Sequence, residues 1–148
     1  MKMFRTFLRS ALCSAVFASG AMVHAEGPSD GQVAARAAAL EVAGAFSNDG
    51  FKLRDGYWSG AIAKGEAPVL ALNLFAGNHY WFSVATTSAG TPVIELFDEA
   101  GRPVETEPWK DGQRAAAGFS AVASGPYFLR IRTGTGEAAD FCVVYSYK

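Results

Sequence analysis

The chain of 148 residues has few of the side chains that enzymes use for proton transfer, nucleophilic attack or metal binding. It contains two histidines and two cysteines, and one of each lies in the first 25 residues, which have the features of an export signal. His79 and Cys142 therefore remain after export. This excludes a metal site built from several histidines, and it excludes a disulfide within the exported chain.

Motifs for nucleophilic catalysis are also missing. The stretch 56–60, Gly-Tyr-Trp-Ser-Gly, does not have the spacing of the Gly-x-Ser-x-Gly elbow. His79 follows a turn and begins an aromatic segment, so we expect a turn or edge residue there. Cys142 lies between Phe141 and Val143 with no basic neighbour in sequence that would lower its pKa, which predicts a small buried apolar residue. The sequence therefore favours a protein that is not an enzyme.

Positive charge is scarce as well. The chain has 13 Lys and Arg residues against 14 Asp and Glu residues, and three of the basic residues fall in the first 25 positions. The remainder carries ten basic and 14 acidic residues, a net charge of about −4. Because the basic residues are scattered rather than clustered, we expect no nucleic-acid partner.

The N-terminus has the three parts of a secretory signal. Lys2, Arg5 and Arg9 precede an apolar stretch over 11–23, and small residues follow up to Ala25, where cleavage is expected. A transmembrane anchor is the alternative, but the stretch is shorter than the roughly 20 apolar residues that span a bilayer, and serine and glycine interrupt it. We expect an exported protein, periplasmic or secreted, with no membrane span after cleavage.

Residues 26–50 form a first segment after the signal. The alanine-rich run 32–46 predicts one short helix capped by Ser29 or Asp30, and the polar stretch 47–50 ends it. Its weakly apolar face is predicted from two sets of residues at helical spacing: Val33, Ala37, Leu40 and Gly44, and Val42 with Phe46. We expect the helix to pack on a larger body, and a partner-binding helix is the alternative.

Residues 51–148 read as strands separated by turns. Apolar and polar residues alternate with a period of two in most of these segments, which is typical of half-buried strands. The predicted strands are 69–75, 80–85, 92–97, 115–122, 127–132 and 141–147. Glycine-containing turns separate them at 76–78, 98–101, 124–126 and 133–136. We therefore predict an all-β fold, an antiparallel β-sandwich preceded by one short helix.

Three stretches within 57–147 resemble the bacterial pre-peptidase C-terminal domain. They are 74–84, a strand and glycine turn before an aromatic strand; 94–104, a strand with an Asp-x-x-Gly turn; and 123–131, which has a Gly-x-Tyr-x-x-Arg pattern. The resemblance implies a jelly-roll-like β-sandwich of an exported protein. Members of this family are often appended to secreted hydrolases, and some bind matrix polymers or calcium.

Aromatic side chains suggest a binding surface. If Tyr80 and Phe82 face the core, Trp81 faces away from it, and Phe128 shares a face with Arg130 and Arg132. The candidate ligand-binding residues are Trp58, Trp81, Trp109, Phe128, Arg130 and Arg132. They favour a non-catalytic module that recognises a polysaccharide or another envelope component. A protein-interaction or structural role in the envelope is the alternative, and coverage of these rings by the helix or the second sheet would remove the surface.

Carboxylates gather between the strands at 92–97 and 115–122. Asp98, Glu99, Glu105, Glu107 and Asp111 could together bind calcium through oxygen ligands. A pair of them could serve as acid and base in a hydrolase. A solvated loop is the third interpretation, and it is the one that the sequence favours. No other cofactor is expected.

Overall fold

The computed structural model describes residues 26–148, so the expected signal at 1–25 lies outside the described residues. This part of the chain forms one α-helix, a short 3-10 turn and ten strands. Their bounds are α1 (Asp30–Phe46), η1 (Ser47–Asp49), β1 (Lys52–Leu53), β2 (Trp58–Ile62), β3 (Val69–Leu74), β4 (His79–Thr86), β5 (Val93–Phe97), β6 (Pro103–Val104), β7 (Glu107–Asp111), β8 (Arg114–Ser120), β9 (Gly125–Arg132) and β10 (Ala139–Tyr147).

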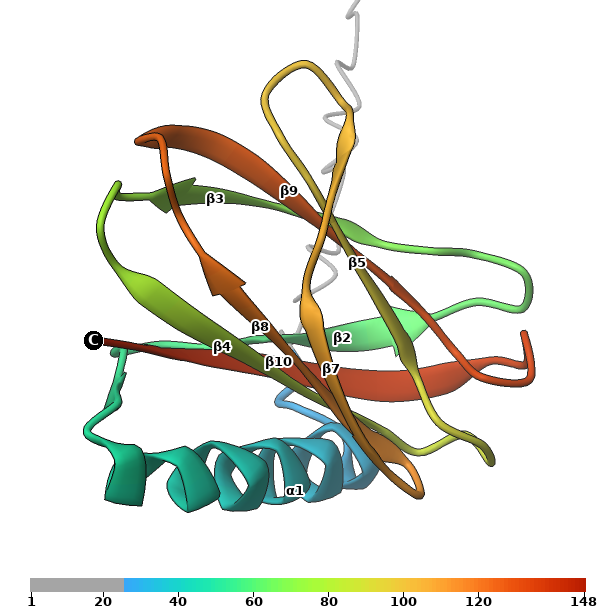
Figure 1. Ribbon diagram of the computed structural model, residues 1–148. Helices are drawn as coiled ribbons and strands as arrows, with labels where there is room; N and C mark the ends of the chain where they lie inside the picture. Colours follow the sequence, from blue (N-terminus) through green and yellow to red (C-terminus); the bar gives the residue numbers. More distant parts are fainter. Residues whose placement is uncertain (1–25) are drawn as a thin grey trace, which may run out of the picture.

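The strands form two antiparallel sheets. The larger sheet has six strands in the order β1-β10-β4-β8-β7, with β2 also paired to β10. The smaller sheet has four strands in the order β3-β9-β5-β6. Figure 1 shows the two sheets as layers, with α1 lying against the larger sheet on the side away from the smaller one. The prediction of a mostly β protein with two sheets and an N-terminal helix is confirmed.

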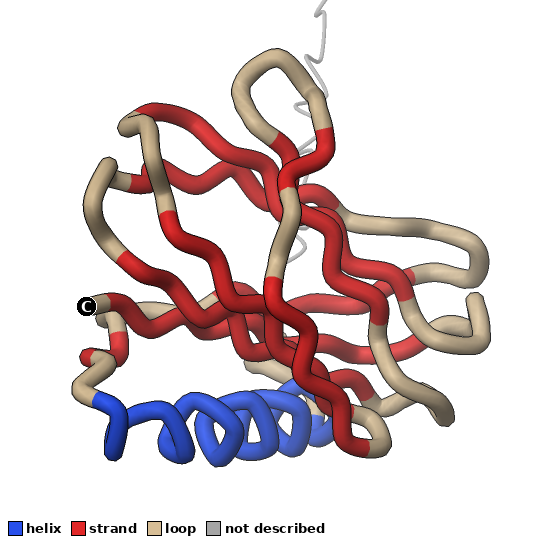
Figure 2. The backbone as a smooth tube through the Cα atoms, viewed as in Figure 1, coloured by secondary structure: helices blue, strands red, loops and turns tan. Residues whose placement is uncertain are grey.

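The main core lies between the two sheets, as the strand alternation predicts. Leu72 and Leu74 on β3 point inward, and so do Phe82 on β4 and Leu129 on β9; each is almost fully buried. Successive residues of a strand point to opposite faces, so this alternation also fixes which residues lie on the two outer faces. Figure 2 shows the strands of the two layers facing one another across this core.

Helix α1 begins where its cap residue predicts. The Oγ of Ser29 accepts a hydrogen bond from the backbone N–H of Gln32 at 3.1 Å and donates one to Asp140 Oδ2 at 2.9 Å. At the other end η1 follows, and Gly50 takes the left-handed conformation with a φ of 84°. Glycine adopts this conformation without steric cost, which explains why the helix ends here.

The buried face of α1 differs from the predicted one. Val33 and Leu40 were expected on the apolar face, but their exposed fractions are 53% and 36%. The buried residues are Ala35, Ala39, Ala43 and Val42, of which Val42 was expected on the apolar face. The three alanines lie with Ala85, Cys142 and Val144 of the larger sheet in a second apolar cluster. Alanine lets the helix backbone approach the sheet closely. The small size of the alanine side chains therefore explains why they, rather than Val33 and Leu40, face the larger sheet.

Four of the ten strands were not predicted, and two of these, β1 and β6, have two residues each. β2 covers a stretch without clear alternation of apolar and polar residues, and β7 covers part of the expected acidic loop. β7 is an edge strand of the larger sheet, where Pro108 costs no ladder hydrogen bond if its nitrogen points outward. Within 26–148, the helix is not long and apolar enough to cross a membrane.

Candidate functional site

Trp58, the first candidate aromatic residue, packs against the main core. It lies on β2, half-buried, with its ring stacked on Tyr145 at a centroid distance of 5.9 Å and an interplanar angle of 15°. The guanidinium of Arg54 lies 5.6 Å from the centroid of the Trp58 ring. Trp58 therefore closes one side of the sandwich, and its ring is engaged within the protein.

Trp81 lies under the end of α1. Its ring is stacked on Phe46 with centroids 4.3 Å apart and an interplanar angle of 8°. On the neighbouring strand β8, an added Cβ at Gly118 would come within 2.9 Å of Trp81 Cζ2, so the ring lies over the space that this glycine leaves open. The alternative that the helix covers this face therefore holds for Trp81, which offers no free ring face for a sugar.

Trp109 lies apart from the other two tryptophans. It is half-buried on the edge strand β7, opposite Ala116 of β8. It lines a small pocket of about 130 Å³ together with Ile94 and Pro108. The three tryptophans therefore lie in three different environments and do not form one platform.

The remaining candidates share one surface, the outer face of the smaller sheet. Phe128 and Arg130 lie on this face of β9, where Tyr127, Leu129 and Ile131 point to the core, as the alternation predicts. Phe97 of β5 lies directly opposite Phe128, and Glu95 lies opposite Arg130. The sequence analysis did not select Phe97 or Glu95, because their pairing partners depend on a register that one sequence does not reveal.

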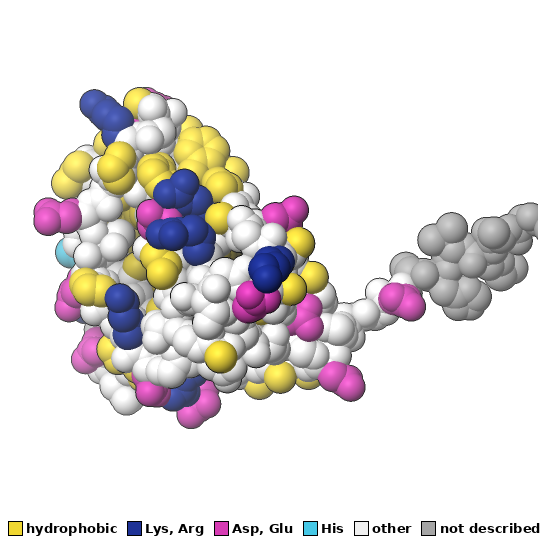
Figure 3. All heavy atoms as spheres, turned by 90° about the vertical axis from the view of Figure 1, so that its right-hand side faces the viewer, with side chains coloured by type: hydrophobic (Ala, Val, Ile, Leu, Met, Phe, Trp, Pro, Cys, Tyr) yellow, Lys and Arg dark blue, Asp and Glu magenta, His cyan; other side chains and the backbone are white. Residues whose placement is uncertain are grey.

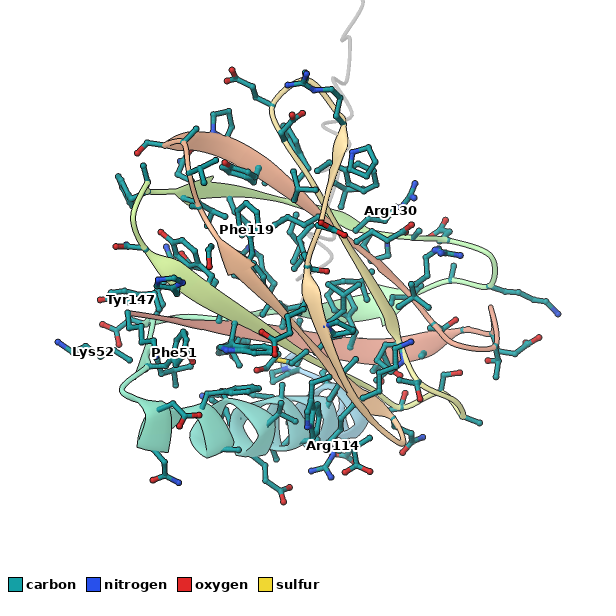
Figure 4. All side chains as sticks on the ribbon, in the orientation of Figure 1. Phe51, Lys52, Arg114, Phe119, Arg130 and Tyr147 are labelled. Atoms are coloured by element: carbon teal, nitrogen blue, oxygen red, sulfur yellow. The ribbon has the colours of Figure 1, made fainter. Side chains whose placement is uncertain are left out.

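This outer face is open in the described part of the chain, since α1 lies on the larger sheet (Figure 1). Arg130 projects from β9 on the side remote from α1 (Figure 4). Figure 3 shows Lys and Arg side chains gathered beside hydrophobic ones on the surface that it presents. We call the surface formed by Val93, Glu95, Phe97, Phe128, Arg130 and Arg132 the β5–β9 face.

One carboxylate holds both arginines of the β5–β9 face. Glu95 Oε2 accepts a hydrogen bond from Arg130 Nε at 2.8 Å and one from Arg132 Nε at 3.2 Å. The hydrogen bond from Arg130 is the main cause that lowers the pKa of Glu95, and the same bond raises the pKa of Arg130. The guanidinium of Arg130 also lies 4.9 Å from the centroid of the Phe97 ring. The Nη atoms of Arg130 and Arg132 make no hydrogen bond within 26–148, so they can donate to a ligand.

A groove of about 870 Å³ on the larger sheet contains the only histidine after the expected signal. His79 begins β4 and pairs with Ser120 of β8, and its Nδ1 lies 2.6 Å from Ser120 Oγ. Glu105 and Glu107 line the same groove. Sequence reasoning missed Ser120, since the two residues are 41 positions apart and meet only through strand pairing. Within the described chain no carboxylate bonds to the other ring nitrogen, so a Ser-His-acid triad is not assembled.

The five candidate calcium ligands do not come together. Asp98 accepts hydrogen bonds from the backbone N–H groups of Ala100 and Arg102 and forms an ion pair with the Arg102 side chain. The bonds with Arg102 are the main cause that lowers the pKa of Asp98. Asp111 forms an ion pair with Arg114. Glu99 lines one depression with Asp98 and Glu105, and Arg102 lines it too. No group of three or more potential metal ligands occurs among residues 26–148.

Cys142 is fully buried on β10 beneath α1. Burial away from water raises the pKa of its thiol to about 11. A thiol with this pKa holds its proton at neutral pH, and the thiolate is the reactive species. The environment of Cys142 is therefore that of an unreactive core residue.

A scan against models of known protein families gave no match for this chain, and a search of curated proteins gave no similar sequence. The function is therefore inferred from the geometry of the described residues. Of the six candidate ligand residues, only Phe128, Arg130 and Arg132 lie together on one open surface. The residues that complete this surface are Phe97 and Glu95.

Proposed function

We propose that this protein is an exported, non-catalytic binding module that recognises a polysaccharide of the cell envelope through the β5–β9 face. The observation that carries the proposal is the arrangement of Phe97 and Phe128 as a cross-strand pair beside two arginines that share Glu95. Arg130 and Arg132 are half-exposed, so their guanidinium groups reach solvent on an open sheet face.

The chemistry of this face suits a sugar chain that carries carboxylate groups. Aromatic rings provide flat apolar surface against which the C–H face of a sugar can pack. Arginine binds carboxylates with two parallel hydrogen bonds, and the Nη atoms of Arg130 and Arg132 are available for this. Glu95 fixes both arginines at Nε, which lowers the entropy lost when they bind. An extended sheet face also matches the extended shape of a polysaccharide.

A protein partner in the envelope is the second candidate. Arginine and aromatic residues contribute much of the binding energy at protein interfaces, and this face contains both types. The two candidates differ in salt dependence and in ligand size, so binding experiments distinguish them. A hydrolase that uses Glu105, Glu107 and Asp111 is the least favoured, since Asp111 is engaged by Arg114 at a distance from the groove.

Export and a jelly-roll-like connection of the strands are parts of the same proposal. Export is supported by the sequence of residues 1–25. A jelly-roll-like connection is supported by the way the chain alternates between sheets. β2 and β4 belong to the larger sheet, whereas β3 and β5 belong to the smaller one. The resemblance to the pre-peptidase C-terminal domain is consistent with both.

Isothermal titration calorimetry of residues 26–148 with polygalacturonate and with uncharged dextran tests the proposal. We expect polygalacturonate to bind, with an affinity that falls as salt concentration rises, because the arginines form charged contacts. The variants Phe128→Ala and Arg132→Gln should each weaken binding by tenfold or more, which corresponds to about 1.4 kcal/mol.

A variant in the groove of the larger sheet provides the control. His79→Ala removes the imidazole from the groove and should leave polygalacturonate binding unchanged. If His79→Ala weakens binding while Phe128→Ala does not, the site lies in the groove and the proposal is wrong. If neither polysaccharide binds and an envelope protein binds in a Phe128-dependent way, the second candidate replaces the first.

A further inference from the structure

The exposed edges of the two sheets differ in how well they are protected from pairing with another strand. Edge strands are usually blunted by proline, charge or short length, and a glycine in the interior of a strand weakens it. β7 contains Pro108 and three charged residues, and β6 has two residues that include Pro103. β1 also has two residues, and β2 contains Gly60 at its centre. β3, with the sequence Val-Leu-Ala-Leu-Asn-Leu, has none of these features.

The backbone of β3 has unpaired groups along its free side. Within residues 26–148, β3 pairs only with β9, so its other side is an edge of the smaller sheet in the described part of the chain. The carbonyl of Pro68 accepts a hydrogen bond from Ile131 N–H of β9 at 3.0 Å. Because N–H and C=O groups of alternate residues point to opposite sides of a strand, those of Val69, Ala71 and Asn73 point away from β9. These groups need an extended strand as partner.

The side chains of β3 are compatible with such a partner. Val69, Ala71 and Asn73 are exposed on the outer face, and the exposed fraction of Val69 is 55%. Leu70 points inward but is only half-buried at the margin of the main core. None of these residues is charged, so a partner strand would meet no charge to desolvate on β3.

We infer that β3 pairs with β3 of a second copy of this chain, in antiparallel orientation about a twofold axis at Ala71. In this register Ala71 lies opposite its own counterpart and Val69 lies opposite Asn73, with about two backbone hydrogen bonds for each such pair. Leu70 lies opposite Leu72 on the inner side, which extends the core across the junction. The strand is thus complementary to itself, which is what an isologous interface requires.

A second copy fits because β3 has no charged residue, so the twofold register places no like charges of the two β3 strands opposite one another. Arg130, the nearest charge on the neighbouring strand, lies opposite Val69 and is already paired with Glu95. The dimer joins the two smaller sheets into one continuous sheet. The inference rests on the edge of the sheet and does not depend on the proposed ligand.

Sedimentation equilibrium of residues 26–148 tests the inference. We expect the wild type to have twice the mass of one chain. Ala71→Pro removes an outward N–H without affecting the ladder with β9 and should weaken the dimer at least tenfold. Ala71→Lys places two ammonium groups opposite one another and should weaken it several-fold. Ala71→Gln adds similar bulk without charge and should leave the dimer unchanged.

Hydrogen exchange identifies the strand that pairs. In the dimer the amides of Val69, Ala71 and Asn73 should exchange slowly, and in the Ala71→Lys variant those of Val69 and Asn73 should exchange quickly. Equal thermal midpoints for the Gln and Lys variants would show that both remain folded. A wild type that is monomeric at every concentration overturns the inference. The edge of β3 would then be available for a strand of another protein. A dimer that survives Ala71→Lys with fast exchange at these amides also overturns it.

Discussion

Replacing Gly118 with alanine should destabilise the protein, although alanine is normally the better residue in a strand. A Cβ at this position would lie 2.9 Å from Trp81 Cζ2 and 3.0 Å from Trp81 Cη2, which is closer than carbon atoms approach without repulsion. The indole cannot easily move away, because Phe46 of α1 is stacked on it at 4.3 Å. The added methyl group therefore has to displace the ring, the strand or the end of the helix.

Two opposing effects determine how much Gly118→Ala changes the free energy of unfolding. Inserting an extra methyl group into a packed region costs about 1 to 3 kcal/mol. Alanine in place of glycine in a strand recovers about 0.5 to 1 kcal/mol, because less conformational entropy is lost on folding. The backbone of Gly118 does not have a positive φ, so no conformational strain is added. The two ranges leave a net loss of about 0 to 2.5 kcal/mol in the free energy of unfolding for Gly118→Ala, with a central value of about 1 kcal/mol.

Urea unfolding followed by circular dichroism measures this change, and Gly44→Ala provides the matched control. Gly44 lies on the exposed side of α1 with nothing within 4 Å of an added Cβ. The same substitution should therefore stabilise the protein by up to about 1 kcal/mol there. In a Phe46→Ala background the ring of Trp81 is free to shift, so Gly118→Ala should cost less than in the wild type. A Gly118→Ala variant that is stabilised as much as the Gly44→Ala control would refute the packing of Trp81 between helix and sheet.

The remaining predictions concern the helix cap and the buried thiol. Ser29→Ala should lower the free energy of unfolding by about 1 kcal/mol, because the cap of α1 and the bond to Asp140 are lost together; an unchanged urea midpoint would contradict the capping role. Cys142 should resist a thiol reagent at pH 8 until the protein unfolds. Because the folded protein keeps the thiol proton up to a pKa of about 11, against an ordinary value of 9.0, the stability due to the thiol should be complete below pH 9 and fall between those values. Comparison with Cys142→Ala at several pH values checks this, and a difference that grows in favour of the wild type as the pH rises would show the reasoning to be wrong.

Local patterns in the sequence predicted the secondary structure where packing agrees with them. Alternation identified β3, β4, β9 and β10 and the residues that each directs to the core. The cap and stop residues identified α1 to within two residues at its start. β7 was missed because proline and charges, which protect an edge strand from further pairing, are also typical of a loop.

Long-range packing explains what the sequence could not reveal. The helix was expected to bury Val33 and Leu40, yet it buries three alanines and Val42, because small side chains allow the helix to approach the sheet closely. Alternation placed Trp81 on the outer face correctly, but the contact with Phe46 depends on where α1 ends over the sheet. The contact of His79 with Ser120 likewise depends on the register of β4 and β8.

The candidate binding surface was predicted only in part, because some of its residues come together only through strand pairing. Phe128, Arg130 and Arg132 were identified because they alternate along one strand. Phe97 and Glu95 belong to β5, and only the pairing of β5 with β9 brings them to the same surface. Trp58 and Trp109 were included because tryptophan is a common sugar-binding residue, but their positions in the fold separate them from this surface.

The most direct test of the binding proposal is to map amide chemical shifts of residues 26–148 during a titration with short galacturonate oligosaccharides. The account predicts that the largest shifts occur in β5 and β9, at Glu95, Phe97, Phe128, Arg130 and Arg132, with small shifts at His79 and Ser120. Chemical-shift changes centred on the groove that contains His79 would contradict the account. So would the absence of any change up to the solubility limit of the oligosaccharides.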